Sequence, residues 1–232
     1  MNRFLTILVA MTILACDKKQ KQIGTKFPEP KVETLDDTLP RPSIDYQGNL
    51  LRMTLGDSAN KFELFCTKDG DHFTVDSVLI AALHAGKSAQ KINLGWNETY
   101  LSLDEIGFSI YDDANFDGHN DLTINNYAGN YTSSSSFWLF DEKSGEFVHE
   151  PSLDSIYNPG FEPSTKRILS SWHAGLSTFS DDIYIWKGNK VVLLESITEN
   201  RDFPQADGTH YSVKRLVNGK YIEKDSIAKK PD

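Results

Sequence analysis

The strongest structural signal in the chain is the segment Ile106-Gly-Phe-Ser-Ile-Tyr-Asp-Asp-Ala-Asn-Phe-Asp-Gly-His-Asn-Asp-Leu-Thr-Ile-Asn125. Within it, oxygen-bearing side chains stand at the first, third, fifth and ninth places of a loop that has Gly118 at its sixth place. This spacing is typical of a calcium loop of the D-x-[DN]-x-[DN]-G type, and Ca²⁺ prefers roughly six to eight oxygen ligands. The predicted ligands are Asp113, Asn115, Asp117, Asp121 and, at the seventh place, the backbone carbonyl of His119.

The segments on either side of this loop predict strands. Residues 106–111 and 122–125 alternate apolar and polar side chains with a period of two. An EF-hand has flanking helices and a bidentate glutamate at the twelfth place, where this chain has Ile124. The pattern therefore predicts a strand–calcium loop–strand unit. The alternative is a hairpin turn at Asp117-Gly118, lined by solvated carboxylates.

The chain beyond residue 42 predicts an all-β domain. Short apolar segments alternate with turn signals such as Ser144-Gly145, Gly188-Asn189 and Asn218-Gly219. We expect one antiparallel meander, a small propeller-like fold or a sandwich over residues 43–228, followed by a tail at 229–232. The clearest predicted strands are 50–55, 62–66, 137–140, 147–149, 168–172, 182–186, 191–197 and 211–216.

Two segments need separate interpretation. Residues 75–83 fit either a helix face or a strand, and we favour a strand that turns at 85–87 and returns over 87–94. Residues 101–105 predict a single helical turn just before the calcium unit.

The N-terminus predicts export and a lipid anchor. Arg3 precedes the apolar run Phe4 to Leu14, which is too short to span a bilayer, and Ile13-Leu14-Ala15-Cys16 follows. This resembles the lipobox of bacterial lipoproteins, although leucine two places before the cysteine is less usual. The resemblance implies a signal peptide at 1–15, cleavage after Ala15 and lipid on Cys16. The alternative is an ordinary signal peptide, or an N-terminal tail that is anchored to the membrane by its apolar run.

Residues 16–42 predict a tether, because scattered prolines and charges with few aromatic residues bury little apolar surface. We therefore expect the protein in the periplasm, with the outer membrane favoured, although Asp17 directly after the cysteine retains lipoproteins at the inner membrane in some bacteria. The formal charge of −9 and a pI near 5.1 argue against nucleic-acid binding. If Cys16 carries lipid, Cys66 has no intramolecular disulfide partner and is expected to be a buried, inert thiol.

The calcium loop and several later stretches together resemble a family of periplasmic calcium-loop proteins, many of them lipoproteins. The residues that carry this resemblance are Asp113 to Leu122, Phe137 to Phe147, Asn158 to Pro163, Lys166 to Ser171, the loop at Gly175 and the strand containing Tyr184. The loop alone is also similar to those of FG-GAP propeller repeats. The better-understood members of the family are immunity proteins that block peptidoglycan hydrolases injected by rival cells. The resemblance therefore implies an inhibitor of a lysozyme-like hydrolase, with calcium supporting the fold.

Two segments are candidates for entering the cleft of such an enzyme, because rigid aromatic side chains with polar tips are effective anchors. The first is the hairpin tip 171–178, with Trp172, His173 and Gly175; the alternative for Trp172 is a core residue that closes a strand. The second is 127–136, a polar loop containing Tyr131, for which a solvated connection is the alternative.

An enzyme is not expected. The acidic residues of the loop would stay ionised beside a cation, whereas a glycosidase needs one carboxyl with a raised pKa. No H-E-x-x-H, G-x-S-x-G or P-loop pattern occurs. The competing function is a calcium-dependent adhesion module of the FG-GAP type, which presents its loops to a glycan or envelope partner and inhibits nothing.

Overall fold

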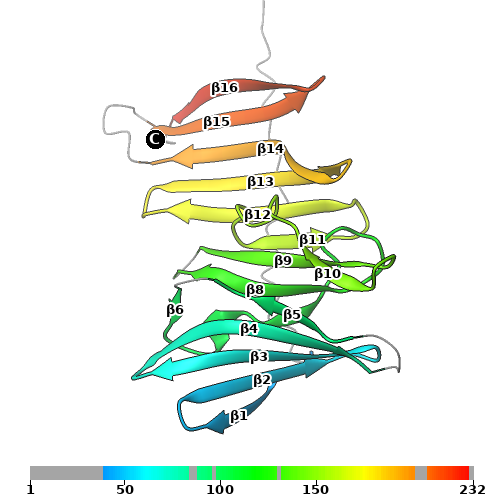
Figure 1. Ribbon diagram of the computed structural model, residues 1–232. Helices are drawn as coiled ribbons and strands as arrows, with labels where there is room; N and C mark the ends of the chain where they lie inside the picture. Colours follow the sequence, from blue (N-terminus) through cyan, green and yellow to red (C-terminus); the bar gives the residue numbers. More distant parts are fainter. Residues whose placement is uncertain (1–38, 84–87, 96–97, 130–131, 202–207, 230–232) are drawn as a thin grey trace, which may run out of the picture. The chain divides into compact units, whose positions relative to one another are not determined.

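A computed structural model describes residues 39–83, 88–95, 98–129, 132–201 and 208–229 (Figure 1). The chain divides into a unit at Met1–Leu39 and a compact unit at Pro40–Asp232. The predicted signal peptide, Cys16, most of the tether and Tyr131 lie outside the described residues. Within the described residues, no helix is both long enough and apolar enough to cross a membrane.

The first sheet is an antiparallel meander in which β1 to β5 follow in sequence order and β6 pairs with β4. Its strands are β1 (Ser43–Gln47), β2 (Leu50–Gly56), β3 (Asn60–Asp69), β4 (His72–Ala82), β5 (Gln90–Asn93) and β6 (Thr99–Tyr100). The period-two pattern of β2 and β3 buries Leu51, Leu64 and their alternate neighbours on one face. All but the last residue of the ambiguous segment 75–83 lies within β4, and its predicted pairing with the returning strand β5 is confirmed.

The second sheet has the order β10-β9-β8-β7. Its elements are the short 3-10 helix η1 (Asp104–Ile106), β7 (Ser109–Asp112), β8 (Asp121–Ala128), β9 (Ser133–Asp141) and β10 (Glu146–His149). The predicted helical turn is confirmed, shifted toward the C-terminus. Gly107 ends it in the left-handed conformation, with φ of 59°.

The third sheet is a meander of six strands in sequence order (Figure 1). Its strands are β11 (Pro159–Glu162), β12 (Arg167–Ala174), β13 (Thr178–Lys187), β14 (Lys190–Asn200), β15 (Gly208–Val217) and β16 (Lys220–Lys229). All strand pairs of the three sheets are antiparallel, and none of the sheets closes into a barrel. The all-β prediction is therefore confirmed as a meander with sandwich-type packing.

Two apolar clusters hold these sheets together. The first joins the inner face of β2, β3 and β4 to residues of the second sheet such as Ile110, Leu122 and Phe147. The side chain of Gln90 adds two hydrogen bonds to the backbone of Phe147, at 2.8 and 2.9 Å. The second cluster contains Ala114, Phe116, Phe137, Leu153, Ile156 and Ile168, and so connects the predicted calcium loop to the third sheet.

The prediction of a long polar loop at 127–136 is wrong. Tyr127 belongs to β8, and Ser133 to Ser136 belong to β9. The serines are half-buried or buried despite their polarity, because neighbouring asparagines satisfy their hydroxyls: Ser135 Oγ donates to Asn125 Oδ1 at 2.8 Å. Only a short connection remains between the two strands.

Candidate functional site

The predicted calcium loop connects β7 to β8, with Asp112 paired to Asp121 at the base of the two strands. Phe116 and Gly118 both have positive φ, at 60° and 93°. Glycine adopts this conformation readily, whereas Phe116 is held in it by packing in the second cluster. The strand–loop–strand arrangement is confirmed, and the loop takes the tight turn that its sequence predicts.

The polar side chains of the loop fold back onto its own backbone. Asp113 accepts hydrogen bonds from the N–H groups of Asp117 and Gly118, at 3.0 and 2.9 Å. The Oδ1 of Asn115 accepts from the N–H of Asp117, and the Oδ1 of Asp117 accepts from the N–H of His119. These bonds fix three of the predicted ligand side chains within one tight turn.

Asp121 is the buried carboxylate of the loop, with no exposed surface. Its two oxygens accept hydrogen bonds from the backbone N–H groups of Ala114, at 2.8 Å, and Phe140, at 2.9 Å. The pKa of Asp121 is raised to about 7, mainly by burial and also by the charges of Asp117 and Asp113, while the hydrogen bonds from the two N–H groups act to lower it. A cation nearby would favour the ionised form of this carboxyl.

The loop is also held from outside. The indole N–H of Trp186 donates to the carbonyl oxygen of Ala114 at 2.8 Å, and Lys166 Nζ donates to the carbonyl oxygen of Phe116 at 3.4 Å. The ring of His119 packs against Phe140, with ring centroids 5.1 Å apart. His119 is predicted to bind calcium through its backbone carbonyl, so its ring is available for the contact with Phe140.

The fit of the loop to a cation can be judged from its charges. None of Asp113, Asp117 and Asp121 forms a salt bridge with another described residue. In the described part of the chain, no three His, Cys, Asp or Glu side chains converge as a metal-binding group. The predicted donor set of the loop is three carboxylates, one amide and one carbonyl oxygen, and the structure does not bring the three carboxylates together around one point. It consists of the hard oxygen donors that suit Ca²⁺, on a backbone already folded into a tight turn.

A second candidate site is an open groove of about 500 Å³, which we call the hairpin groove. It lies between the β8–β9 connection and the tip of the β12–β13 hairpin. Both segments predicted to contact a partner contribute to it, although Tyr131 itself lies outside the described residues. The residues lining the hairpin groove are Tyr127, Gly129, Thr132, Tyr157, Trp172, His173, Ala174, Gly175 and Leu176.

The indole of Trp172 is fixed at the wall of this groove. It donates from Nε1 to Asp182 Oδ2 at 2.8 Å, and its ring lies 5.7 Å from that of Tyr157. Trp172 is half-buried and belongs to neither apolar cluster. Of the two interpretations of Trp172, the structure therefore favours a partly exposed residue over a core residue.

The hairpin tip is joined to the β8–β9 connection by Thr132 Oγ1, which donates to the carbonyl oxygen of His173 at 3.2 Å. The Nδ1 of His173 lies 2.8 Å from the carbonyl oxygen of Gly175, and Gly175 has a φ of 67°. Leu176 is 95% exposed at the tip. The sequence did not single out Tyr157 and Leu176, because their part in the groove depends on the pairing of distant hairpins.

The two candidate sites lie at opposite ends of the same strands. β8 begins at Asp121 in the loop and ends at Ala128 beside the hairpin groove. Eight residues of strand at about 3.3 Å each separate the sites by roughly 25 Å. A cation in the loop therefore does not line the hairpin groove.

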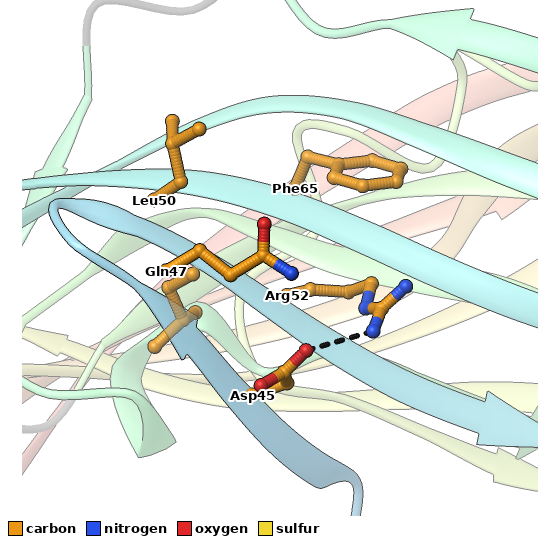
Figure 2. Close-up of a pocket in the computed structure, with 6 residues that line it drawn as sticks. Asp45, Gln47, Leu50, Arg52 and Phe65 are labelled. Atoms are coloured by element: carbon orange, nitrogen blue, oxygen red, sulfur yellow. Dashed lines mark hydrogen bonds and ion pairs between the residues drawn. The ribbon is translucent and has the colours of Figure 1, made fainter.

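A third depression, of about 110 Å³, lies on the outer face of the first sheet (Figure 2). Its Arg52 is paired with Asp45 at 2.8 Å and with Glu63 at 3.4 Å. The depression is also lined by Leu50, Gln47 and Phe65 (Figure 2). Since the chain neutralises the guanidinium itself and the volume is small, we assign no ligand to it.

No protein-family model matches the chain, and no curated protein matches it. A solved structure described as a Xanthomonas type IV secretion system related protein is similar in fold, with a TM-score of 0.55. The match has 19% sequence identity and covers 80% of this chain and 99% of the other. At this identity the likeness shows a shared all-β fold that extends over nearly the whole of the solved chain.

Proposed function

We propose that the protein is a lipid-anchored periplasmic immunity protein that inhibits a lysozyme-like peptidoglycan hydrolase. The tip of the β12–β13 hairpin enters or covers the substrate cleft of the enzyme, and the hairpin groove receives the rim of that cleft. Ca²⁺ in the loop before β8 has a structural role: it stabilises the fold and does not contact the enzyme.

The observation that carries this proposal is the meeting of two separate segments at the hairpin groove. Leu176 protrudes at the tip, while Trp172 and Tyr157 form a fixed aromatic wall behind it. Binding energy in protein interfaces is concentrated in such aromatic anchors, because fixed side chains lose little conformational entropy on binding. The hydrogen bond from Thr132 to His173 holds the tip in place before a partner arrives.

A structural role for calcium is proposed because the predicted calcium loop lies far from the hairpin groove. Asp113, Asn115, Asp117, Asp121 and the carbonyl of His119 would hold the ion, and the ion would neutralise the repulsion among the carboxylates. Fixing Asp121 fixes the start of β8, whose other end borders the hairpin groove. Five such residues leave one or more of roughly six to eight coordination positions to water or another oxygen ligand.

The proposed location rests on the lipobox-like segment before Cys16. The solved protein of similar fold is described as related to a type IV secretion system. Secretion systems cross the cell envelope, so a protein tethered in the envelope can contact an enzyme that is delivered through it. This agrees with an immunity protein held in the periplasm.

The test is inhibition of a panel of lysozyme-like hydrolases by the full-length chain in mild detergent, in calcium and in chelator. Inhibition of at least one enzyme in calcium is expected, with weaker inhibition in chelator. A matched pair of variants locates the surface: Leu176→Ala at the tip should weaken inhibition about tenfold or more. Leu101→Ala, at a 66% exposed leucine outside the groove, should not. Equal effects of the two variants would remove the hairpin groove from the proposal.

A further inference from the structure

A second groove borders the predicted calcium loop, at the end of β8 and β13 away from the hairpin groove. It has a volume of about 350 Å³, is open to solvent, and is called the loop groove below. Small-molecule sites have volumes of roughly 300–1,000 Å³. The residues lining the loop groove are Asn115, Asp117, Leu139, Glu150, Trp186, Gly188 and Asn189.

The apolar part of this groove comes from Leu139 and the indole of Trp186. The only polar atom of that indole is already engaged, because Nε1 donates to Ala114 at 2.8 Å. Trp186 therefore offers ring carbons to an occupant of the groove, in an orientation fixed by the loop. An aromatic ring fixed in this way suits a ligand with exposed C–H groups on one face.

The polar part consists of acceptors and amides that the chain has oriented. Glu150 Oε1 accepts from the N–H of Ser152 at 3.0 Å, and Asp117 Oδ2 accepts from Asn115 Nδ2 at 2.8 Å. Each of these carboxylates keeps further lone pairs for a ligand. Asn189 adds an exposed amide from the β13–β14 turn. The groove thus offers several hydrogen-bond acceptors beside an apolar wall.

The charge of the lining restricts the class of ligand. Two carboxylates and no cationic side chain line the loop groove among the described residues. Phosphates, carboxylates and nucleic acids are disfavoured by repulsion from Glu150, which is not among the predicted calcium ligands and keeps its charge when the ion is bound. A ligand that has many hydroxyl donors, carries no negative charge and has an apolar face complements this lining.

We propose that the loop groove binds a neutral saccharide, which stacks on Trp186 and donates hydroxyl hydrogen bonds to Asp117 and Glu150. This inference rests on the proposed binding of calcium by the loop, but not on the proposed inhibition of a hydrolase. Asn115 and Asp117 belong both to the loop and to the groove, so whatever orders the loop orders one wall of the groove. Calcium and saccharide binding are therefore coupled, and each strengthens the other by the same factor.

The test uses the full-length chain in a detergent without a sugar headgroup. The probe is the neutral β-1,4-linked trisaccharide of N-acetylglucosamine, which the proposed envelope location makes a relevant glycan. NMR follows the indole N–H signals of the four tryptophans while the trisaccharide is added in calcium or in chelator. The signal of Trp186 is expected to shift in calcium, and to shift less in chelator. Isothermal titration should show tighter calcium binding when the trisaccharide is present.

Variants separate the loop groove from the hairpin groove. Glu150→Gln keeps the size of the side chain but removes its charge, and it should weaken trisaccharide binding about tenfold, the effect of losing one charge-assisted hydrogen bond. Glu142→Gln, at an exposed glutamate that does not line the groove, should leave binding unchanged.

Three results would overturn the inference. The first is that the trisaccharide fails to bind although calcium binds. The second is that the Trp172 signal moves in place of Trp186, which would put the sugar in the hairpin groove. The third is that a trilysine peptide shifts Trp186 while the trisaccharide does not, which would make the groove a site for cationic peptides. Loss of hydrolase inhibition bears on the hairpin groove alone, so the two proposals fail separately.

Discussion

Trp186 on β13 donates its indole N–H to the carbonyl oxygen of Ala114, a residue 72 positions earlier in the predicted calcium loop, at 2.8 Å. Ala114 is fully buried, so its carbonyl has no access to water when this bond is lost. This hydrogen bond therefore links the geometry of the loop to the third sheet.

Replacing Trp186 with phenylalanine tests this link. We expect Trp186→Phe to keep most of the ring packing and to lower the free energy of unfolding by about 1–3 kcal/mol, because the Ala114 carbonyl becomes a buried, unpaired acceptor. Calcium affinity should fall as well, since Ala114 lies between two predicted ligands. Urea unfolding and calorimetric calcium titration measure the two effects.

The matched control is Trp172→Phe, which removes an indole hydrogen bond to Asp182 at the other end of the strands. It should lower stability without changing calcium affinity. If both variants bind calcium like the parent chain, the bond from Trp186 has no part in shaping the loop.

Calcium is expected to stabilise the folded chain, because the loop carries carboxylates without a salt-bridge partner among the described residues. A ligand present at about 100 times its Kd stabilises the native state by roughly 2.7 kcal/mol. Thermal unfolding in calcium and in chelator should differ accordingly, and Asp117→Ala should remove the difference. Asp71→Ala, in the exposed β3–β4 turn, serves as the control. An Asp117→Ala chain that calcium still stabilises fully would contradict the assigned ligands.

Two glycines with similar backbone angles predict different losses of stability. Gly107 and Gly175 have φ values of 59° and 67°, so alanine at either position is strained by about 1–2 kcal/mol. A Cβ at Gly107 would also lie 2.3 Å from the side-chain nitrogen of Asn125, whereas nothing lies within 4 Å at Gly175.

Asn125 cannot move away without loss, because it donates to the carbonyl of Glu105 and accepts from Ser135. We therefore expect Gly107→Ala to be more destabilising than Gly175→Ala by at least about 1 kcal/mol in urea unfolding. Equal losses in the two variants would show that Asn125 relaxes freely.

Stability is expected to fall at alkaline pH. Burial, with a contribution from the charge of Asp76, raises the pKa of the Cys66 thiol from 9.0 to about 12. Burial raises the pKa of Tyr100 to about 12 as well, helped by the charges of Glu98 and Cys66. Between pH 9 and 12 the unfolded chain therefore loses its proton from Cys66 first, so stability decreases as the pH rises.

The slope from one such group is about 1.4 kcal/mol per pH unit. Chemical denaturation from pH 8 to 11 measures it, and Cys66→Ala should make the decline shallower. A native chain whose Cys66 reacts rapidly with a thiol reagent at pH 8 would contradict the burial that underlies this expectation.

Part of this organisation could be predicted from residues close together in the chain. The period-two pattern of 50–55 and 62–66, with turn signals at their ends, predicted β2 and β3 because alternation is a local property of a half-buried strand. The spacing from Asp113 to Asp121 predicted a tight loop between two strands for the same reason. The segment 127–136 was misassigned because its serines are polar, and only their pairing with Asn125, Asn126 and Asn158 explains their burial.

Local sequence encodes the all-β class, the strand–loop–strand unit and the residues predicted to bind a cation, since each depends on neighbours within a few residues. Tertiary packing, in contrast, brings the tips at Gly129 and Gly175 into one groove and places Trp186 and Glu150 beside the loop. These residues meet because antiparallel register and two apolar clusters bring distant strands together. Such packing depends on the whole set of buried contacts, and no local pattern encodes it.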